Sequence, residues 1–313
     1  MVRFKIFLMT MVLSIATISA QNRDLMGDKE FQELNKLNPA FTGVLNKLRI
    51  LGNVSQKYDI GLETRLFKSA NHLGFYMTFD DIENLNRKSF NFTYARDFDV
   101  KEKLQFKLGA NLNYQVKIFH NDSQLFKNFT FKDFNGFEYE VDSLNAKDFR
   151  TESKLFDLHV GGSMLYKNLV LGVSLNHVNR PDISVQSSIK EKANLAVNAH
   201  LMGFFTLGKL VTVIPTGVYA IQKDDVFSSY GISLNKNNFT LSGQYESLNK
   251  ETGYDVGITY RFKKRHLLNV SYRTNLATTG LQQDGIFSAT INSNIFKPKK
   301  ELEGILDKIK ALY

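Results

Sequence analysis

Residues 254–262 read Tyr-Asp-Val-Gly-Ile-Thr-Tyr-Arg-Phe, and this stretch decides the fold. Apolar side chains occupy every second position, and polar or small residues fill the positions between them. A period of two places the two sets on opposite faces of a β-strand. One face is wholly apolar, whereas the other carries Asp255 and Arg261. The strand is therefore expected to separate lipid from a wet interior.

The same alternation recurs through the rest of the chain. Clear copies lie at residues 239–246, 195–201 and 169–176, and the last candidate strand is 285–296. Extending the pattern towards the N-terminus predicts further strands at residues 154–167, 103–118, 88–98, 72–79, 58–66 and 46–55. The whole chain then has about 14 strands, with 12 as the alternative, because an even number closes a barrel with both ends on one side.

Residues Met1–Ala20 have the features of a secretory signal. Arg3 and Lys5 precede an apolar run from Ile6 to Ile18, and a small residue, Ala20, ends the segment. No later run of about 18 apolar residues could form a spanning helix. An exported chain of alternating segments predicts an all-β fold, a transmembrane antiparallel β-barrel whose apolar face meets outer-membrane lipid.

Four regions follow from these patterns. We expect a signal peptide over residues 1–20, a short periplasmic segment over 21–45, the barrel over 46–296 and a periplasmic C-terminal helix over 297–313. The apolar residues of the last region follow helical spacing: Leu302, Ile305, Leu306, Ile309 and Leu312. This amphipathic helix either packs on the barrel's own turns, or closes the lumen from below, or docks a periplasmic partner.

The connectors between strands differ in length and charge. Short ones, such as residues 167–168, 207–209, 235–238 and 263–265, alternate with longer or more acidic ones. Outer-membrane barrels have short periplasmic turns and longer outer loops, so the short set is assigned to the periplasm. On this assignment, residues 119–153 form one long external loop, with a short hairpin around Phe126–Phe134.

The residue types that carry most enzyme chemistry do not form a recognisable pattern. There is no cysteine, and the six histidines lack metal-protease or other ligand spacing. No serine-hydrolase elbow or phosphate-binding glycine loop occurs. The acidic pairs Asp80-Asp81 and Asp224-Asp225 are interpreted as solvated loop tips. We therefore expect no enzyme activity, no cofactor and no metal site. The net charge of +9 is a modest basic excess that could suit nucleic acid, but an exported protein rarely meets any, so we expect no nucleic-acid partner.

Two segments are more specific than the periodicity. The first is Asn38-Pro39-Ala40-Phe41-Thr42-Gly43, where Pro39 fixes φ and Gly43 gives a permissive backbone before the first strand. It is expected to end the N-terminal segment at the periplasmic mouth of the barrel.

The second specific segment is Gly172–Pro181, reading Gly-Val-Ser-Leu-Asn-His-Val-Asn-Arg-Pro. Pro181 is expected to end strand pairing at the outer rim. The polar and terminal residues of this segment form either a hydrogen-bond network between loop and wall or a surface that grips a secreted protein: Asn176, His177, Asn179, Arg180 and Pro181.

Together, and placed after a signal peptide, these two segments resemble the PorP/SprF family of type IX secretion membrane proteins. The resemblance runs through most of residues 21–296. The chain departs from the family's usual pattern at residues 53–58 and 283–286. These departures concern the subgroup of the family to which the chain would belong, more than the family itself.

The resemblance implies a non-enzymatic outer-membrane role with two forms. A SprF-like member holds the C-terminal domain of a secreted surface adhesin at the cell surface, often in gliding bacteria. A PorP-like member works with the periplasmic ring lipoproteins of the secretion machine. The long loop over residues 119–153 favours the first role, and the tail over 297–313 favours the second. A passive pore or solute transporter is the rival class.

Overall fold

The structure is a computed structural model of the whole chain. It describes residues 34–43, 48–54, 57–66, 70–82, 85–101, 104–119, 130–132, 138–140, 152–184, 191–208, 211–248, 251–262, 266–276 and 286–294. The expected signal peptide and the expected C-terminal helix lie outside these residues. No helix in the described part of the chain is both long and apolar enough to cross a bilayer.

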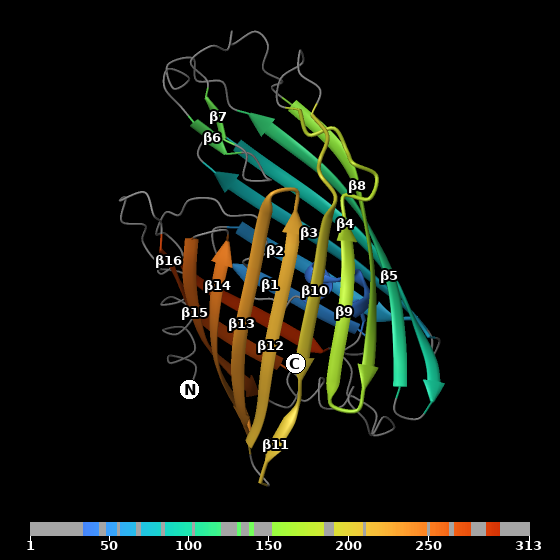
Figure 1. The fold of residues 1–313 in the computed structure, drawn as a ribbon, viewed down its shortest axis with the longest axis vertical. Helices are drawn as coiled ribbons and strands as arrows, with labels where there is room; N and C mark the ends of the chain where they lie inside the picture. The colour runs from blue at the N-terminus through green and yellow to red at the C-terminus, as the bar shows by residue number, and fades with distance from the viewer. Residues whose placement is uncertain are drawn as a thin grey trace, which may run out of the picture.

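Two short helical turns precede a series of strands (Figure 1). The elements are α2 (Leu34–Leu37), η1 (Pro39–Phe41), β1 (Leu48–Val54), β2 (Lys57–Arg65), β3 (Asn71–Ile82), β4 (Leu85–Lys101), β5 (Leu104–Phe119), β6 (Thr130–Lys132), β7 (Glu138–Glu140), β8 (Glu152–Tyr166), β9 (Leu169–Asn176), β10 (Ala196–Gly203), β11 (Phe205–Leu207), β12 (Val211–Gln222), β13 (Asp225–Lys236), β14 (Phe239–Leu248), β15 (Glu251–Phe262), β16 (His266–Leu276) and β17 (Ile286–Asn294).

The main sheet closes on itself as an antiparallel barrel. Each strand of this sheet pairs with the strand that precedes or follows it along the chain, except that β5 pairs with β8 because β6 and β7 form a separate hairpin, and β1 pairs with β17 to close the circle. Both β10 and β11 pair with β12 in one register, so they form a single strand interrupted at Phe204. In this register Pro215 of β12, which has no N–H for the ladder, lies opposite Gly203, next to the interruption. Counting β10 and β11 together, the barrel has 14 strands, as the alternation predicted.

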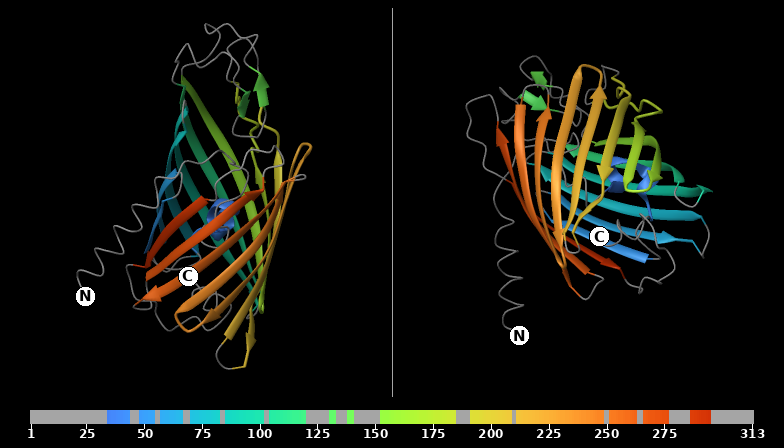
Figure 2. Two further views of the ribbon diagram at one scale, coloured as in Figure 1. Left: turned by 90° about the vertical axis from the view of Figure 1, so that its left-hand side faces the viewer. Right: turned by 60° about the horizontal axis from the view of Figure 1, so that its bottom comes forward.

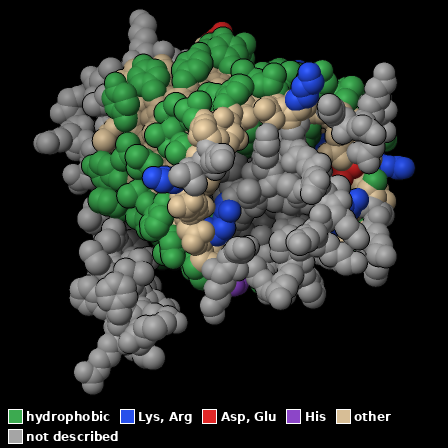
Figure 3. Space-filling model, turned by 90° about the horizontal axis from the view of Figure 1, so that it is seen from below, with side chains coloured by type: hydrophobic (Ala, Val, Ile, Leu, Met, Phe, Trp, Pro, Cys, Tyr) green, Lys and Arg blue, Asp and Glu red, His purple; other side chains and the backbone are tan. Residues whose placement is uncertain are grey.

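The two faces of the wall have opposite chemistry. On β15, Tyr254, Val256 and Ile258 are exposed on the outside, whereas Asp255 and Arg261 alternate with them on the inner face. Figure 3, a view from below, shows hydrophobic side chains gathered along the left and upper sides of the outer wall. This arrangement confirms the predicted division between a lipid face and a polar lumen, which the burial of polar residues on the inner face reinforces.

The barrel is much taller on one side. Strands β4, β5 and β8 have 17, 16 and 15 residues, whereas β9 and β10 have eight each. The tall strands rise at the end that also carries the β6–β7 hairpin, here called the long-loop end (Figures 1 and 2). The opposite end, with the tight turns at 167–168 and 237–238, is called the short-turn end. A hairpin was expected at Phe126–Phe134, and the structure has it slightly later, from β6 to β7.

Candidate functional site

The N-terminal segment, residues 35–43, lies inside the barrel (Figure 2). The sequence placed its Asn38–Gly43 motif at the periplasmic mouth. Instead, Asn38, Pro39, Ala40 and Phe41 are buried against the inner wall, and η1 contacts β4, β5 and β8. Several residues of wall separate these contacts from the short-turn end. The motif therefore builds an internal plug rather than a rim turn, and residues 35–43 are called the plug below.

Asn38 attaches the plug to the wall. Its Oδ1 accepts a hydrogen bond from the Ala40 N–H at 2.9 Å and so caps η1, with Pro39 in the first turn. Its Nδ2 donates to the carbonyl oxygens of Gly162 on β8 at 3.0 Å and Val173 on β9 at 3.2 Å. One side chain thus fixes both the shape of the plug and its position across two strands.

Glycines of the wall form the space that the plug fills. A Cβ at Gly109 on β5 would lie 2.4 Å from the Pro39 carbonyl carbon, and one at Gly161 on β8 would lie 2.1 Å from Asn38 Oδ1. Gly43 has a φ of +67°, and its Cβ would lie 2.5 Å from the His72 ring. A larger residue at Gly109 or Gly161 would collide with the plug, and one at Gly43, within the plug, would collide with His72 of the wall. Close approach therefore explains glycine at all three positions.

A buried ion pair holds the C-terminal end of the plug. Lys107 Nζ lies 2.7 Å from Asp97 Oδ1 and donates to the Thr42 carbonyl oxygen at 3.4 Å. His72 Nε2 lies 2.8 Å from the other oxygen of Asp97. The Lys107 side chain is only 1% exposed, so its charge is compensated by Asp97 rather than by water.

The other end of the plug reaches towards a different part of the wall. Leu37 packs with Val218 on β12 and Phe227 on β13, and its carbonyl oxygen accepts a hydrogen bond from Ser174 Oγ at 2.8 Å. The plug therefore contacts inner-wall residues from β3 round to β13. It also brings the two specific sequence motifs together, because Val173 and Ser174 belong to the second motif.

The second motif leaves the wall at His177. This residue has a φ of +59°, and the chain turns through Arg180, whose N–H donates to the His177 carbonyl oxygen at 2.9 Å. Arg180 is exposed and Pro181 is buried, with its carbonyl oxygen bonded to the Ala193 N–H. Asn176, at the end of β9, is half-buried.

Asn179 extends the sheet beyond the end of β9. Its Oδ1 accepts from the Leu158 N–H at 2.9 Å, and its Nδ2 donates to the Phe156 carbonyl oxygen at 2.7 Å. These two groups of β8 have no β9 partner, because pairing between β8 and β9 begins at Val160. A single side chain thus takes the place of a strand residue. The motif forms the hydrogen-bond network between loop and wall that was one of the two expectations.

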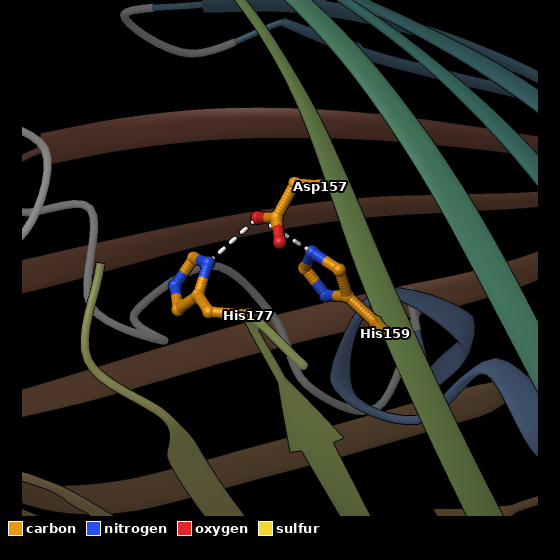
Figure 4. Close-up of side chains that lie close together, drawn as sticks. All are labelled: Asp157, His159 and His177. Atoms are coloured by element: carbon orange, nitrogen blue, oxygen red, sulfur yellow. Dashed lines mark hydrogen bonds and ion pairs between the residues drawn. The ribbon is translucent and has the colours of Figure 1, made fainter. Parts of the chain in front are cut away.

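A cluster of titratable side chains lies beside this turn at the long-loop end. Asp157 Oδ2 lies 2.9 Å from His159 Nε2 and 2.6 Å from His177 Nδ1 (Figure 4). Sequence reasoning placed His177 at a functional rim but did not join it to Asp157 and His159. The missed signal is the Asp-x-His spacing in one strand, which puts both side chains on the inner face.

A closed antiparallel barrel with an apolar outer wall and a polar, partly filled lumen defines an outer-membrane β-barrel protein. Within this class, the chain belongs to the PorP/SprF family. The family model described as type IX secretion system membrane protein PorP/SprF matches residues 31–292. The chain is therefore an outer-membrane component of the type IX secretion system.

One solved structure supports the barrel fold. The CymD monoaromatic hydrocarbon channel matches with a TM-score of 0.50 and 11% identity, over 91% of this chain and 97% of that one. The toluene transporter TbuX of Ralstonia pickettii has a TM-score of 0.48 and 10% identity, over 89% and 94%. The toluene transporter TodX of P. putida has 0.47 and 12%, over 82% and 91%. No protein with a curated description matches the chain.

Proposed function

We propose that this protein is a non-enzymatic, SprF-like scaffold that attaches a secreted adhesin to the cell surface. In this proposal the long-loop end faces the outside and the short-turn end faces the periplasm, following the usual orientation of such barrels. The observation that carries the proposal is the tall wall formed by β4, β5 and β8 at the long-loop end.

The tall wall is longer than the membrane requires. A tilted transmembrane strand needs about 9–11 residues. The three strands exceed this by about five residues, which corresponds to roughly 15 Å of sheet above the bilayer. On its β9 side, residues 152–159 of β8 lie beyond the paired region, and the Asn179 turn is bonded there. A raised sheet with an adjoining structured loop suits recognition of a folded partner more than solute passage.

The presence of the plug favours the scaffold role over the passive-pore role. It is bonded to the wall by Asn38 and Lys107 and packs through Leu37 on β12 and β13. Opening a wide channel along this wall would require breaking these contacts and exposing buried polar groups. Purified protein in planar bilayers is therefore expected to show no large, steady conductance. Such a conductance would favour the passive-pore alternative.

Deletion of the gene tests the proposal in cells. Loss of one large adhesin from the cell surface into the medium, with the secretion of other type IX cargo intact, is the expected result. Re-expression of the full chain should return the adhesin to the cells. A general secretion defect would instead favour the PorP-like role with periplasmic ring lipoproteins, and would overturn the attachment proposal.

A further inference from the structure

We infer that Asp157, His159 and His177 form a binding site for a divalent transition-metal ion at the long-loop end of the lumen. The inference does not rest on the attachment proposal. It rests on the position of three ligand atoms, on the unusual surroundings of Asp157, and on the way in which the chain holds His177 in place.

The three side chains converge from two segments of the chain. Asp157 and His159 point inward from β8, and His177 meets them from the turn after β9 (Figure 4). One ligand atom from each residue lies within 4.8 Å of the other two. The two contacts to Asp157 Oδ2, at 2.9 and 2.6 Å, are shorter by less than about 1 Å than the ligand separation of about 3.4 Å that zinc–ligand bonds of about 2.1 Å give at the tetrahedral angle. Small side-chain rotations would therefore admit an ion.

Asp157 differs from three other acids on the inner wall, each of which contacts a lysine or an arginine. Asp80 contacts Arg87, Asp97 contacts Lys107, and Glu246 contacts Arg273. In the described part of the chain, the ion pairs of Asp157 are with the two imidazoles alone. Its side chain is only 4% exposed, and its Oδ1 is buried without a hydrogen-bond partner among the described residues. A buried carboxylate that lacks a permanent cation favours the binding of one.

The donor set indicates the class of metal. Two imidazole nitrogens and one carboxylate oxygen suit zinc and its first-row neighbours, whereas calcium and magnesium prefer oxygen ligands alone. The ion would take the place of the protons between Asp157 and the two histidines. The proton of the His159 ring would then lie on Nδ1, and that of the His177 ring on Nε2. The rings of His159 and His177 are 18% and 13% exposed, so water can complete the coordination.

The backbone holds His177 ready for this role. The residue adopts a positive φ, and Asn179, two residues later, is bonded to Phe156 and Leu158, which flank Asp157 on β8. Asn179 thus bonds the turn to β8 at the residues before and after Asp157, before any ion binds. A bound metal would cross-link the 177–184 segment to the wall and stiffen it.

Zinc binding to the full-length protein, folded in detergent, tests the inference. Calorimetric titration with ZnCl₂ should show one ion per chain, and CoCl₂ should give the visible absorption of a low-symmetry cobalt site. Excess calcium or magnesium should not displace either ion. Asp157→Asn and His159→Gln should each weaken zinc binding by about 100-fold or more, because each removes a direct ligand.

A matched histidine variant separates this site from adventitious binding. His266 lies at the short-turn end, where its ring bonds to Ser293, so His266→Gln should leave zinc affinity unchanged. Heat-dependent migration on gels should confirm that every variant is folded. The inference is overturned if the wild-type chain binds no zinc, or if Asp157→Asn and His159→Gln bind zinc as tightly as His266→Gln does. The role of the three residues would then be only to bond the turn after β9 to β8.

Discussion

The side-chain amide of Asn38 donates a hydrogen bond to the carbonyl oxygen of Val173, 135 residues away, at 3.2 Å. This contact joins the two specific motifs of the sequence and ties the plug to the barrel wall. It follows that the plug is a part of the folded barrel with its own set of wall contacts. Substitutions in these contacts should therefore change both stability and permeability.

Asn38→Ala should destabilise the plug. The substitution removes the cap of η1 and two bonds to wall carbonyls, all made by a buried side chain. We expect a loss of about 1–3 kcal/mol in the free energy of unfolding, measured by urea titration in detergent. Asn238→Ala, in an exposed turn at the short-turn end, should change this free energy by less than about 0.5 kcal/mol. Equal effects of the two variants would argue against a bound plug.

Gly109→Leu should displace the plug from the wall. Its Cβ would meet the backbone of Pro39, which cannot move away as a side-chain end could. The barrel strands do not depend on this contact, so the variant should still fold but should conduct ions in planar bilayers. Gly243→Leu, where a Cβ has open space, is the matched control and should stay closed. A closed Gly109→Leu barrel would show that the plug does not limit permeability.

Lys107→Met should be strongly destabilising, because it leaves the buried Asp97 without its cation. The cost of breaking a buried pair in this way is about 3–5 kcal/mol. The double variant Asp97→Asn with Lys107→Met should recover a large part of that loss, since no unpaired charge remains. Thermal unfolding of the two single variants and the double variant measures the coupling. Strict additivity would mean that the two residues do not interact.

Val256→Lys should weaken insertion into the bilayer. Val256 is exposed on the outer wall near the middle of β15, where lysine costs about 2–4 kcal/mol. Phe239→Lys, beside the 237–238 turn, should cost only about 0–1 kcal/mol, because it lies near the interface. Refolding into lipid vesicles across a urea series measures both. A larger cost at Phe239 would place the bilayer differently on the barrel.

The barrel was predictable because the alternation of apolar and polar residues within each strand identifies its two faces. Residues 254–262 alternate so regularly that the strand and its lipid-facing side follow from the sequence alone. The strand count of 14 followed from extending the same pattern. Pro215 gave no comparable signal for the interruption at Phe204. The position of the break depends on which residues of the neighbouring strand lie opposite Pro215, and the sequence pattern does not give this.

The plug and the histidine cluster were not predictable in the same way. Asn38-Pro39 reads as a turn wherever it lies, and only long-range contacts with Gly109, Gly161 and Val173 place it inside the barrel. Likewise, Asp157 and His177 meet because β9 ends early and the chain turns back over β8. Contacts between residues far apart in sequence depend on tertiary packing, which a periodic pattern does not record.

The most direct test of the attachment role removes the segment between β5 and β8, two neighbouring strands of the tall wall. Because Ile118 pairs with Glu152, a short Gly-Ser linker can replace residues 120–151 and still close the β5–β8 hairpin. This chain should be expressed in the deletion strain, and its heat-dependent gel migration should show a folded barrel. We predict that the adhesin then appears in the medium instead of on the cells. Full retention of the adhesin on cells that carry the shortened, folded barrel would contradict the proposal.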